Sequence, residues 1–251
     1  MESVVAAIQQ RWGTKALHRV ERAGPGTQIP HIPTGFPNLD KALAGIGGIP
    51  RGRLTEFLGT PTSGMATLAL KIIANAQAEK DRAAYFDLGG TFDPDYAARC
   101  HINLSHLFIV RPLSGSEALE ITRSLIASRG LGVLVFDSVA HLLAEPHSAQ
   151  RLSAALRQLP PVLAQSSCAC IFLTSLSVGG ISSPANYPSN FALPHYATIR
   201  LLLAKERWLY KGADVRGYEA RVEVIKNELG PAGRKATIAV TFNGLMKGDG
   251  T

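Results

Sequence analysis

The stretch Gly59-Thr60-Pro61-Thr62-Ser63-Gly64-Met65-Ala66-Thr67 decides the fold class of this chain. It follows the apolar run 54–58 and precedes residues 68–73, which have the pattern of a helix. A strand, a Gly-x4-Gly turn and a helix form the layout of a phosphate-binding loop, in which backbone N–H groups and a helix N-terminus surround an anion. The sequence therefore predicts the shape of such a loop.

The side chains of this loop depart from the motif. After the second glycine the motif requires Lys, which neutralises the outer phosphates, and then Ser or Thr, which holds Mg²⁺. Met65 and Ala66 occupy these two places. Loss of the lysine alone removes a charge-assisted contact of about 1.5–3 kcal/mol.

Composition favours one soluble α/β domain, with or without a small arm. The 251 residues are 46% apolar and 18% charged, and the net charge of +7 is a modest basic excess that suits nucleic acid or an acidic partner. Cys100, Cys168 and Cys170 are too few for a disulfide framework, and the Cys-x-Cys pair lies in an apolar run, which favours structural thiols over a metal site. No apolar run approaches the ~18 residues of a membrane span and no signal peptide is evident, so we expect a cytoplasmic protein without membrane contact.

Apolar strands alternate with helices over most of the chain. We expect strands at 54–58, 83–87, 107–110, 131–136 and 168–174, and helices at 34–43, 68–73, 94–99, 115–128 and 149–164. This alternation predicts a mainly parallel sheet between helices. The later segments 198–204, 207–211, 218–226 and 236–242 are short strands and turns, which predict antiparallel strands at one edge of the sheet.

The N-terminus is expected to form an arm. Residues 2–11 have helical spacing, residues 15–20 alternate like a strand, and residues 22–33 are a Gly- and Pro-rich linker. Such an arm packs either on a neighbouring subunit or on its own core, and the sequence leaves both open. The expected organisation is an arm and linker at 1–33, a core at 34–245 and a disordered tail at 246–251.

Five segments in order resemble the RecA recombinase family core. They are 8–15, which looks like its N-terminal arm; 34–40 with 48–53, which leads into the phosphate loop; 86–97, whose Tyr96 would stack on adenine; 133–140, which is similar to its Walker B strand with Asp137; and 221–227, which presents Lys226 to a neighbour's nucleotide. The resemblance implies a RecA-like P-loop NTPase core and covers residues from about Ile8 to Phe242.

Several catalytic positions of that family differ here. Gly89 stands where the resemblance implies the glutamate that activates water, Ser175 where it implies a glutamine that senses the γ-phosphate, and Glu228 reverses the charge of a second lysine beside Lys226. Phosphoryl transfer depends on positioned charge. We therefore expect a pseudo-ATPase rather than an enzyme, with no catalytic residues, no metal and at most weak ATP binding. The vestigial nucleotide site would comprise Gly59, Thr62, Ser63, Gly64, Met65, Ala66, Tyr96, Asp137 and Lys226.

Two segments bear on DNA. Residues 178–194, where the resemblance implies a DNA-facing loop, carry no Asp, Glu, Lys or Arg, and fit a protein contact, aromatic stacking or a plain surface loop. The corresponding first loop, 142–151, is short. Basic residues gather later, so the candidate DNA-binding residues are Arg207, Lys211, Arg216, Arg234 and Lys235, although a solvated sheet edge explains them equally well.

The leading hypothesis is a DNA-repair accessory protein of the SOS, or DNA-damage, response. Within the family the pattern most resembles ImuA-type translesion-synthesis proteins, which act by contact with RecA or a translesion polymerase. The expected partners are RecA or RecA-like subunits through the arm, a translesion polymerase, and single-stranded DNA. The alternatives are an ATP-dependent DNA recombinase with unusual phosphate ligands, and an ATP-independent single-strand binder.

Overall fold

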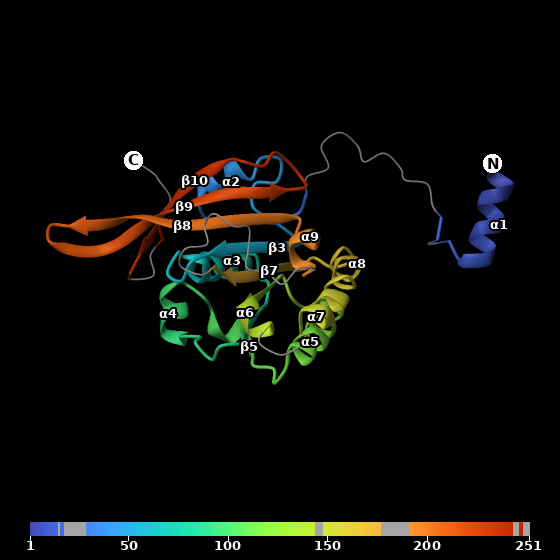
Figure 1. Ribbon diagram of the computed structural model, residues 1–251, viewed down its shortest axis with the longest axis horizontal. Helices are drawn as coiled ribbons and strands as arrows, with labels where there is room; N and C mark the ends of the chain where they lie inside the picture. Colours follow the sequence, from blue (N-terminus) through green and yellow to red (C-terminus); the bar gives the residue numbers. More distant parts are fainter. Residues whose placement is uncertain (15, 18–28, 144–147, 177–190, 243–245, 248–251) are drawn as a thin grey trace.

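The computed structural model describes residues 1–14, 16–17, 29–143, 148–176, 191–242 and 246–247 (Figure 1). The helices are α1 (Glu2–Trp12), α2 (Pro37–Ala42), α3 (Met65–Ala78), α4 (Pro94–Arg99), α5 (Gly115–Ala127), α6 (Val139–Leu142), α7 (Ser148–Leu156), α8 (Leu159–Leu163) and α9 (Leu193–Tyr196), with a 3₁₀ turn at Leu104–His106. The strands are β1 (His31–Ile32), β2 (Ile49–Pro50), β3 (Leu54–Gly59), β4 (Ala83–Asp87), β5 (Leu107–Val110), β6 (Val133–Asp137), β7 (Ala169–Ser175), β8 (Ile199–Lys211), β9 (Asp214–Asn227), β10 (Lys235–Thr241) and β11 (Met246–Lys247).

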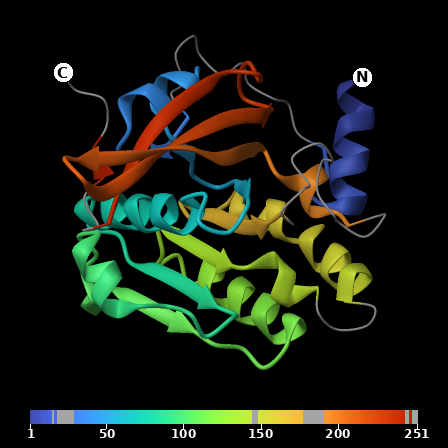
Figure 2. The same cartoon turned by 60° about the vertical axis from the view of Figure 1, so that its left-hand side comes forward.

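A nine-stranded sheet in the order β11-β10-β9-β8-β3-β7-β6-β4-β5 runs through the described part of the chain. The strands from β8 through β3 to β5 pair in parallel, whereas β8, β9, β10 and β11 pair antiparallel. Figures 1 and 2 show β8–β10 on one side of the molecule and β4 and β5 on the other. The predicted fold class, a mainly parallel α/β sheet with an antiparallel edge, is confirmed.

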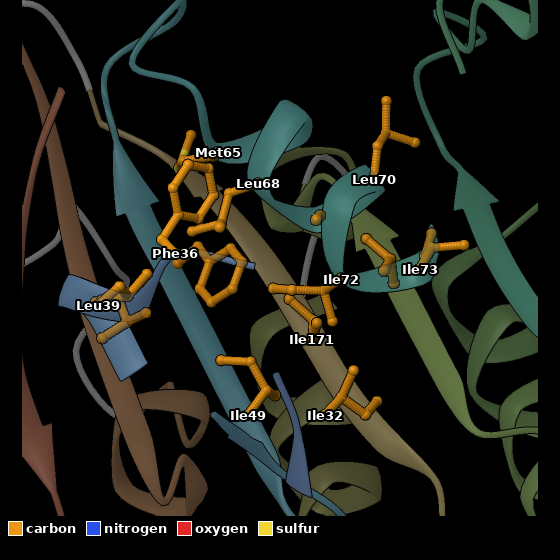
Figure 3. Close-up of a cluster of buried hydrophobic side chains, with 14 of the residues drawn as sticks. Ile32, Phe36, Leu39, Ile49, Met65, Leu68, Leu70, Ile72, Ile73 and Ile171 are labelled. Carbon is orange, nitrogen blue, oxygen red and sulfur yellow. The ribbon is translucent and has the colours of Figure 1, made fainter. Parts of the chain in front are cut away.

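Helices cover both faces of this sheet. One core cluster packs α2, α3 and α4 against side chains such as Phe57, Tyr85 and Ile171, and the other packs α5–α9 against the opposite side chains of the same strands. Figure 3 shows part of the first cluster, in which Phe36, Leu68 and Ile171 come from three separate elements. The inner parallel strands β3, β4, β6 and β7 are buried on both faces, which explains their mainly apolar sequences.

The structure differs from the predicted elements at three places. The predicted helix 149–164 is two helices, since Pro160 and Pro161 cannot donate backbone hydrogen bonds and α8 begins at Leu159. The predicted strands 198–204 and 207–211 are one strand, β8, which continues through a register shift between Lys205 and Arg207. Gly212, at φ 63°, then allows the tight turn into β9.

The third difference concerns the two ends of the chain. Helix α1 is confirmed and ends at Gly13, but the predicted strand 15–20 lies largely outside the described residues. Within the predicted linker, β1 pairs with β2, which requires Gly48 because a Cβ there would lie 2.3 Å from the Ile32 carbonyl oxygen. Within the predicted disordered tail, Met246 and Lys247 pair with β10. In the described residues we find no helix with the length and apolar content needed to cross a membrane.

Candidate nucleotide-binding site

The loop between β3 and α3 has the conformation of an anion cradle. Thr62 at φ 65° and Gly64 at φ 97° are both left-handed, and the Ser63 amide donates to the Thr60 carbonyl at 3.0 Å. Gly64 precedes the 14-residue helix α3 with no side-chain cap, so the amides of the first turn have no competing side-chain acceptor at this end. Gly59 is required because a Cβ there would lie 2.3 Å from Ser63 Oγ. Successive amides of this kind form a concave site for an anion.

Met65 and Ala66 point to different environments. Met65 is only 8% exposed and belongs to the apolar core, where Figure 3 shows it next to Leu68. Ala66 is exposed at the start of the helix. The methionine therefore packs like a core residue, while its backbone still belongs to the loop.

A pocket of about 210 Å³ lies over this loop. Its lining residues comprise Thr60, Pro61, Thr62, Ser63, Gly64, Met65, Ala66, Thr67, Asp137, Leu173, Ser175 and Tyr218. Hydroxyl groups dominate the polar lining and Asp137 supplies its carboxylate. None of these lining residues is a lysine or arginine. In the described part of the chain, the buried Ser63 Oγ has no hydrogen-bond partner.

Two tyrosines extend the site beyond the loop. Tyr96 OH lies 3.0 Å from Thr67 Oγ1, so the predicted base-stacking residue adjoins the pocket. Tyr218 lies against Gly64, where a Cβ would be 3.4 Å from its hydroxyl. Burial, together with the nearby Tyr96, raises the pKa of Tyr218 to about 12, so this hydroxyl stays protonated and can donate. Trp208 and Phe242 pack near Tyr218 with ring centroids at 6.0 and 6.4 Å.

Two carboxylates at the ends of β4 and β6 are held by the fold. Asp137 Oδ2 accepts from Tyr85 OH at 2.5 Å, and burial followed by this carboxylate raises the pKa of Tyr85. Asp87 accepts from the Thr91 and Phe92 amides and forms an ion pair of 2.9 Å with Arg111. Asp87 is thus engaged in structure, whereas Asp137 also faces the pocket.

His141 fills the space beside Gly89. A Cβ on Gly89 would lie 3.0 Å from His141 Cε1, and the neighbouring ring nitrogen Nδ1 lies 3.3 Å from Ser138 Oγ. The position at which the resemblance implies a glutamate is therefore next to an imidazole. No local pattern predicts this contact, because the two residues are far apart in the chain.

Lys226 lies away from the pocket. Its Nζ donates to the carbonyl oxygens of Pro194 and His195 and pairs with Glu228 at 2.8 Å. Most of the predicted site residues line one pocket: Thr62, Ser63, Gly64, Met65, Ala66 and Asp137. Gly59 lies beside them and Tyr96 lies at the edge of the pocket, whereas Lys226 does not line it. Sequence reasoning missed Thr67 and Tyr218. Thr67 could have been recognised as a fourth hydroxyl residue of the loop stretch, directly after Ala66. No local pattern indicated Tyr218.

A buried ion pair supports the strand that leads into the loop. Glu56 on β3 is fully buried, accepts from Arg200 Nε at 2.6 Å and from Thr174 Oγ1 at 2.8 Å. Burial raises the pKa of Glu56, and Arg200 opposes that rise. The pair and Thr174 join β3, β7 and β8 along the strand that leads into the loop.

The predicted DNA-binding residues fall into two groups. Arg207, Lys211 and Arg216 lie on the β8–β9 hairpin, which projects from the body in Figure 1, while Arg234 and Lys235 lie at the start of β10. Lys235 is opposite Glu223 and Arg207 is opposite Glu219, so these two residues are about 14 Å apart along β9 at ~3.4 Å per residue, whereas Lys211, opposite Asp214, is about 31 Å from Lys235.

Ion pairs occupy several of these cations. Arg207 binds Glu219 through two bonds of 2.6 and 2.7 Å, Arg216 pairs with Asp214, and Lys235 pairs with Glu223. Exposed ion pairs of this kind contribute little to stability, so these cations can readily exchange their carboxylate partner for another anion.

The remaining sequence expectations near the site concern the cysteines, a metal and the two predicted DNA-facing loops. The three cysteines are free and buried, and burial raises the pKa of Cys168 to about 12, which fits structural thiols. Among the described residues no group of His, Cys, Asp and Glu could hold a metal by itself. Residues 144–147 and 177–190, from the two predicted DNA-facing loops, lie outside the described residues, and Phe191 beside them is buried.

A glycine-rich cradle between a buried strand and a helix N-terminus, at the carboxyl edge of parallel strands, defines this chain as an α/β protein of the P-loop class. The particular family follows from comparison with known proteins: the RecA N-terminal domain family matches residues 1–247, and the chain belongs to the RecA family. It is 36% identical to Protein RecA of Chloroflexus aggregans over 97% of this chain and 73% of that protein. It is 38% identical to Protein RecA of Thermus thermophilus over 96% of this chain and 75% of that protein.

These comparisons correct one prediction. The expectation of a pseudo-ATPase that is not an enzyme rested on a few replaced side chains. It is wrong, because the likeness to proteins named RecA extends over nearly the whole chain. The RecA family is a family of ATP-dependent recombinases. The membership of a DNA-repair and recombination family is confirmed.

Proposed function

We propose that this protein is an ATP-dependent DNA recombinase of the RecA family that holds the triphosphate with unusual ligands. The observation that carries the proposal is the cradle itself: the left-handed Thr62 and Gly64 keep the loop in an anion-binding shape although position 65 is methionine. The geometry favours a site in which backbone amides and side-chain hydroxyls take the place of the lysine ammonium group that the motif requires.

Each ligand has a defined role in this proposal. The amides of the loop bind the phosphates, and the hydroxyls of Ser63, Thr67 and Tyr218 supply further donors. The unpartnered Ser63 Oγ supports this fit, because a buried hydroxyl ordinarily has a partner. Asp137 would hold Mg²⁺, which would neutralise charge on the phosphates. Tyr96 would contact the base.

DNA would bind along the β8–β9 hairpin. The hairpin combines cations with exposed aromatic rings, since Trp208 is 44% exposed and Lys205 Nζ lies 4.0 Å from its ring centroid. Rings and cations together suit single-stranded DNA, in which bases stack and phosphates need counter-charge. Arg234 and Lys235 would meet a different part of the strand.

Titration of the protein with Mg-ATP tests this function directly. We expect measurable binding, together with phosphate release that single-stranded DNA stimulates. Met65→Lys should tighten ATP binding about 10- to 100-fold, because it restores a charge-assisted contact of about 1.5–3 kcal/mol. Isothermal titration measures the affinity and a phosphate assay measures turnover.

Met65→Gln is the matched control, since it has a similar length without the charge. It should bind ATP like the unmodified protein. A complete lack of ATP binding by the unmodified protein, under conditions in which Met65→Lys binds, contradicts the proposal of unusual ligands.

A second candidate function, contact with another RecA-family subunit, is favoured by the arm. No residue of α1 is buried, and Val4 and Trp12 are 55% and 61% exposed. The edge strand β5 also exposes Phe108 and Ile109. An unpaired apolar edge is a template for an added strand, so the predicted strand 15–20 of one subunit would pair with β5 of the next. The finer assignment, to ImuA-type accessory proteins that also contact a translesion polymerase, would use the same surfaces.

Deletion of residues 1–24 should abolish association between subunits. Analytical ultracentrifugation of the full chain, alone and mixed with a RecA protein, measures it. Phe108→Asp, which places a charge on the receiving edge, should have the same effect while α1 remains. An unchanged sedimentation profile for both variants would refute the arm as the contact.

A further inference from the structure

A second pocket lies between α5 and α7, on the helical side of the molecule. It has a volume of about 260 Å³ and shares no lining residue with the phosphate pocket. Leu119, Leu142 and Leu152 line it and are themselves nearly fully buried, at 4%, 4% and 3% exposure. The pocket therefore has an apolar floor formed by three helices.

Gly115, the first residue of α5, keeps this floor open. A Cβ at this position would lie 3.5 Å from the Leu142 carbonyl oxygen and 3.6 Å from Leu152 Cδ2, which are ordinary contact distances. A longer side chain at this position would enter the pocket. At ~30 Å³ per water molecule, the volume corresponds to about nine waters, which is enough for one large apolar side chain with room around it.

The rim of the pocket is polar and mainly cationic. Arg123 and Arg151 lie there with Glu120, and all three are exposed. Arg123 Nη1 donates to Gln158 Oε1 at 2.9 Å, which ties α5 to the chain just after α7 and holds the guanidinium at the rim. Guanidinium groups suit carboxylates because they can bind both oxygens at once.

We infer that this pocket docks an acidic peptide segment of a partner protein, through one large apolar side chain flanked by Asp or Glu. A buried apolar centre inside a polar rim is the arrangement of an interaction hot spot. Among the described lining residues, two arginines against one glutamate make the rim complementary to an acidic segment. The site does not involve the nucleotide, so it stands apart from the proposed ATP-dependent activity.

The N-terminal helix of a second copy complements the rim less well than an acidic segment does. Helix α1 carries one acidic residue, Glu2, and its charge is balanced by Arg11 in the last turn. A free peptide of residues 1–13 can therefore be tested directly against acidic peptides for binding to this pocket.

Selection from a displayed library of random peptides, each of about twelve residues, tests the inference. The bait is the full chain, and each enriched peptide is then measured by fluorescence anisotropy. We expect enriched peptides to carry one large apolar side chain beside Asp or Glu. Gly115→Phe, which fills the pocket, should weaken their binding by about tenfold or more, whereas Gly115→Ala should not. Arg123→Glu with Arg151→Glu should remove the preference for acidic peptides.

Circular dichroism melting of each variant shows whether weaker binding reflects a filled pocket or a lost fold. Gly115→Ala is the matched control, because it changes the same helix position without filling the pocket. Three results would overturn the inference. They are no enrichment of any peptide, enriched peptides that bind Gly115→Phe as well as the unmodified protein, and stronger binding by the 1–13 peptide than by acidic peptides.

Discussion

Arg200→Met should destabilise the protein by about 3–5 kcal/mol, because it leaves the carboxylate of Glu56 buried without its counter-charge. Arg200 is 12% exposed and Glu56 is not exposed at all, so water cannot replace the lost partner. Urea denaturation at neutral pH measures the loss. Glu56 lies on β3, the strand that leads into the phosphate loop, so any ATP binding should weaken in the same variant.

The pH dependence of Arg200→Met provides a second readout. Burial already raises the pKa of Glu56, and removal of Arg200 removes the main opposing effect. An acid whose pKa is higher in the folded state loses stability as pH rises above its unfolded value, so the variant should be less impaired at about pH 4 than at about pH 7.

Two further variants give the controls for this pair. Glu56→Gln combined with Arg200→Met should recover much of the stability, because no charge remains buried. Arg207→Met breaks the exposed pair with Glu219, and it should cost about 1 kcal/mol or less. A similar loss for Arg200→Met and Arg207→Met would show that Glu56 is solvated or protonated without its partner.

Phe136→Ala should destabilise the protein by about 3–5 kcal/mol, because it removes the middle ring of a buried stack and leaves a cavity. Phe86, Phe136 and Phe172 lie on β4, β6 and β7 with successive ring centroids 4.4 Å apart. Phe136 directly precedes Asp137 on β6, so the variant should also loosen the pocket. Denaturant unfolding measures the first effect.

Phe108→Ala provides the comparison, since this ring lies on the edge strand β5 and is 49% exposed. Its loss should cost about 1 kcal/mol or less. Phe136→Leu should fall between the two, because most of the volume is kept. Equal losses for the alanine variants at 108 and 136 would mean that the stack contributes nothing beyond surface burial.

Much of the fold could be predicted because the signals are local. β4 and β5 have the bounds that their apolar runs predict, and the Gly-x4-Gly turn lies between β3 and α3 as its spacing indicates. Local signals failed at the boundary between α7 and α8, where the apolar period continued across two prolines. They also failed for β8, where Lys205 and Arg207 belong to one long strand whose bulge has no sequence signature.

The candidate site was only partly predictable. The loop residues are contiguous, so Thr62, Ser63 and Gly64 were recognisable together. Tyr218 and His141 were not, because they reach the site from elements more than fifty residues further along the chain. Their places depend on strand order and register.

The sequence by itself determined that this protein is a P-loop α/β protein, because the period of its apolar residues and the glycines of its loop fix each element locally. It could not determine what the replaced residues at positions 65, 66 and 89 mean for activity. Only the tertiary structure decided which side chains converge. Sheet order brings Tyr218 to Gly64 and directs Lys226 toward Pro194 and His195. The physical reason is that pairing register and packing between distant segments depend on the summed burial of many side chains.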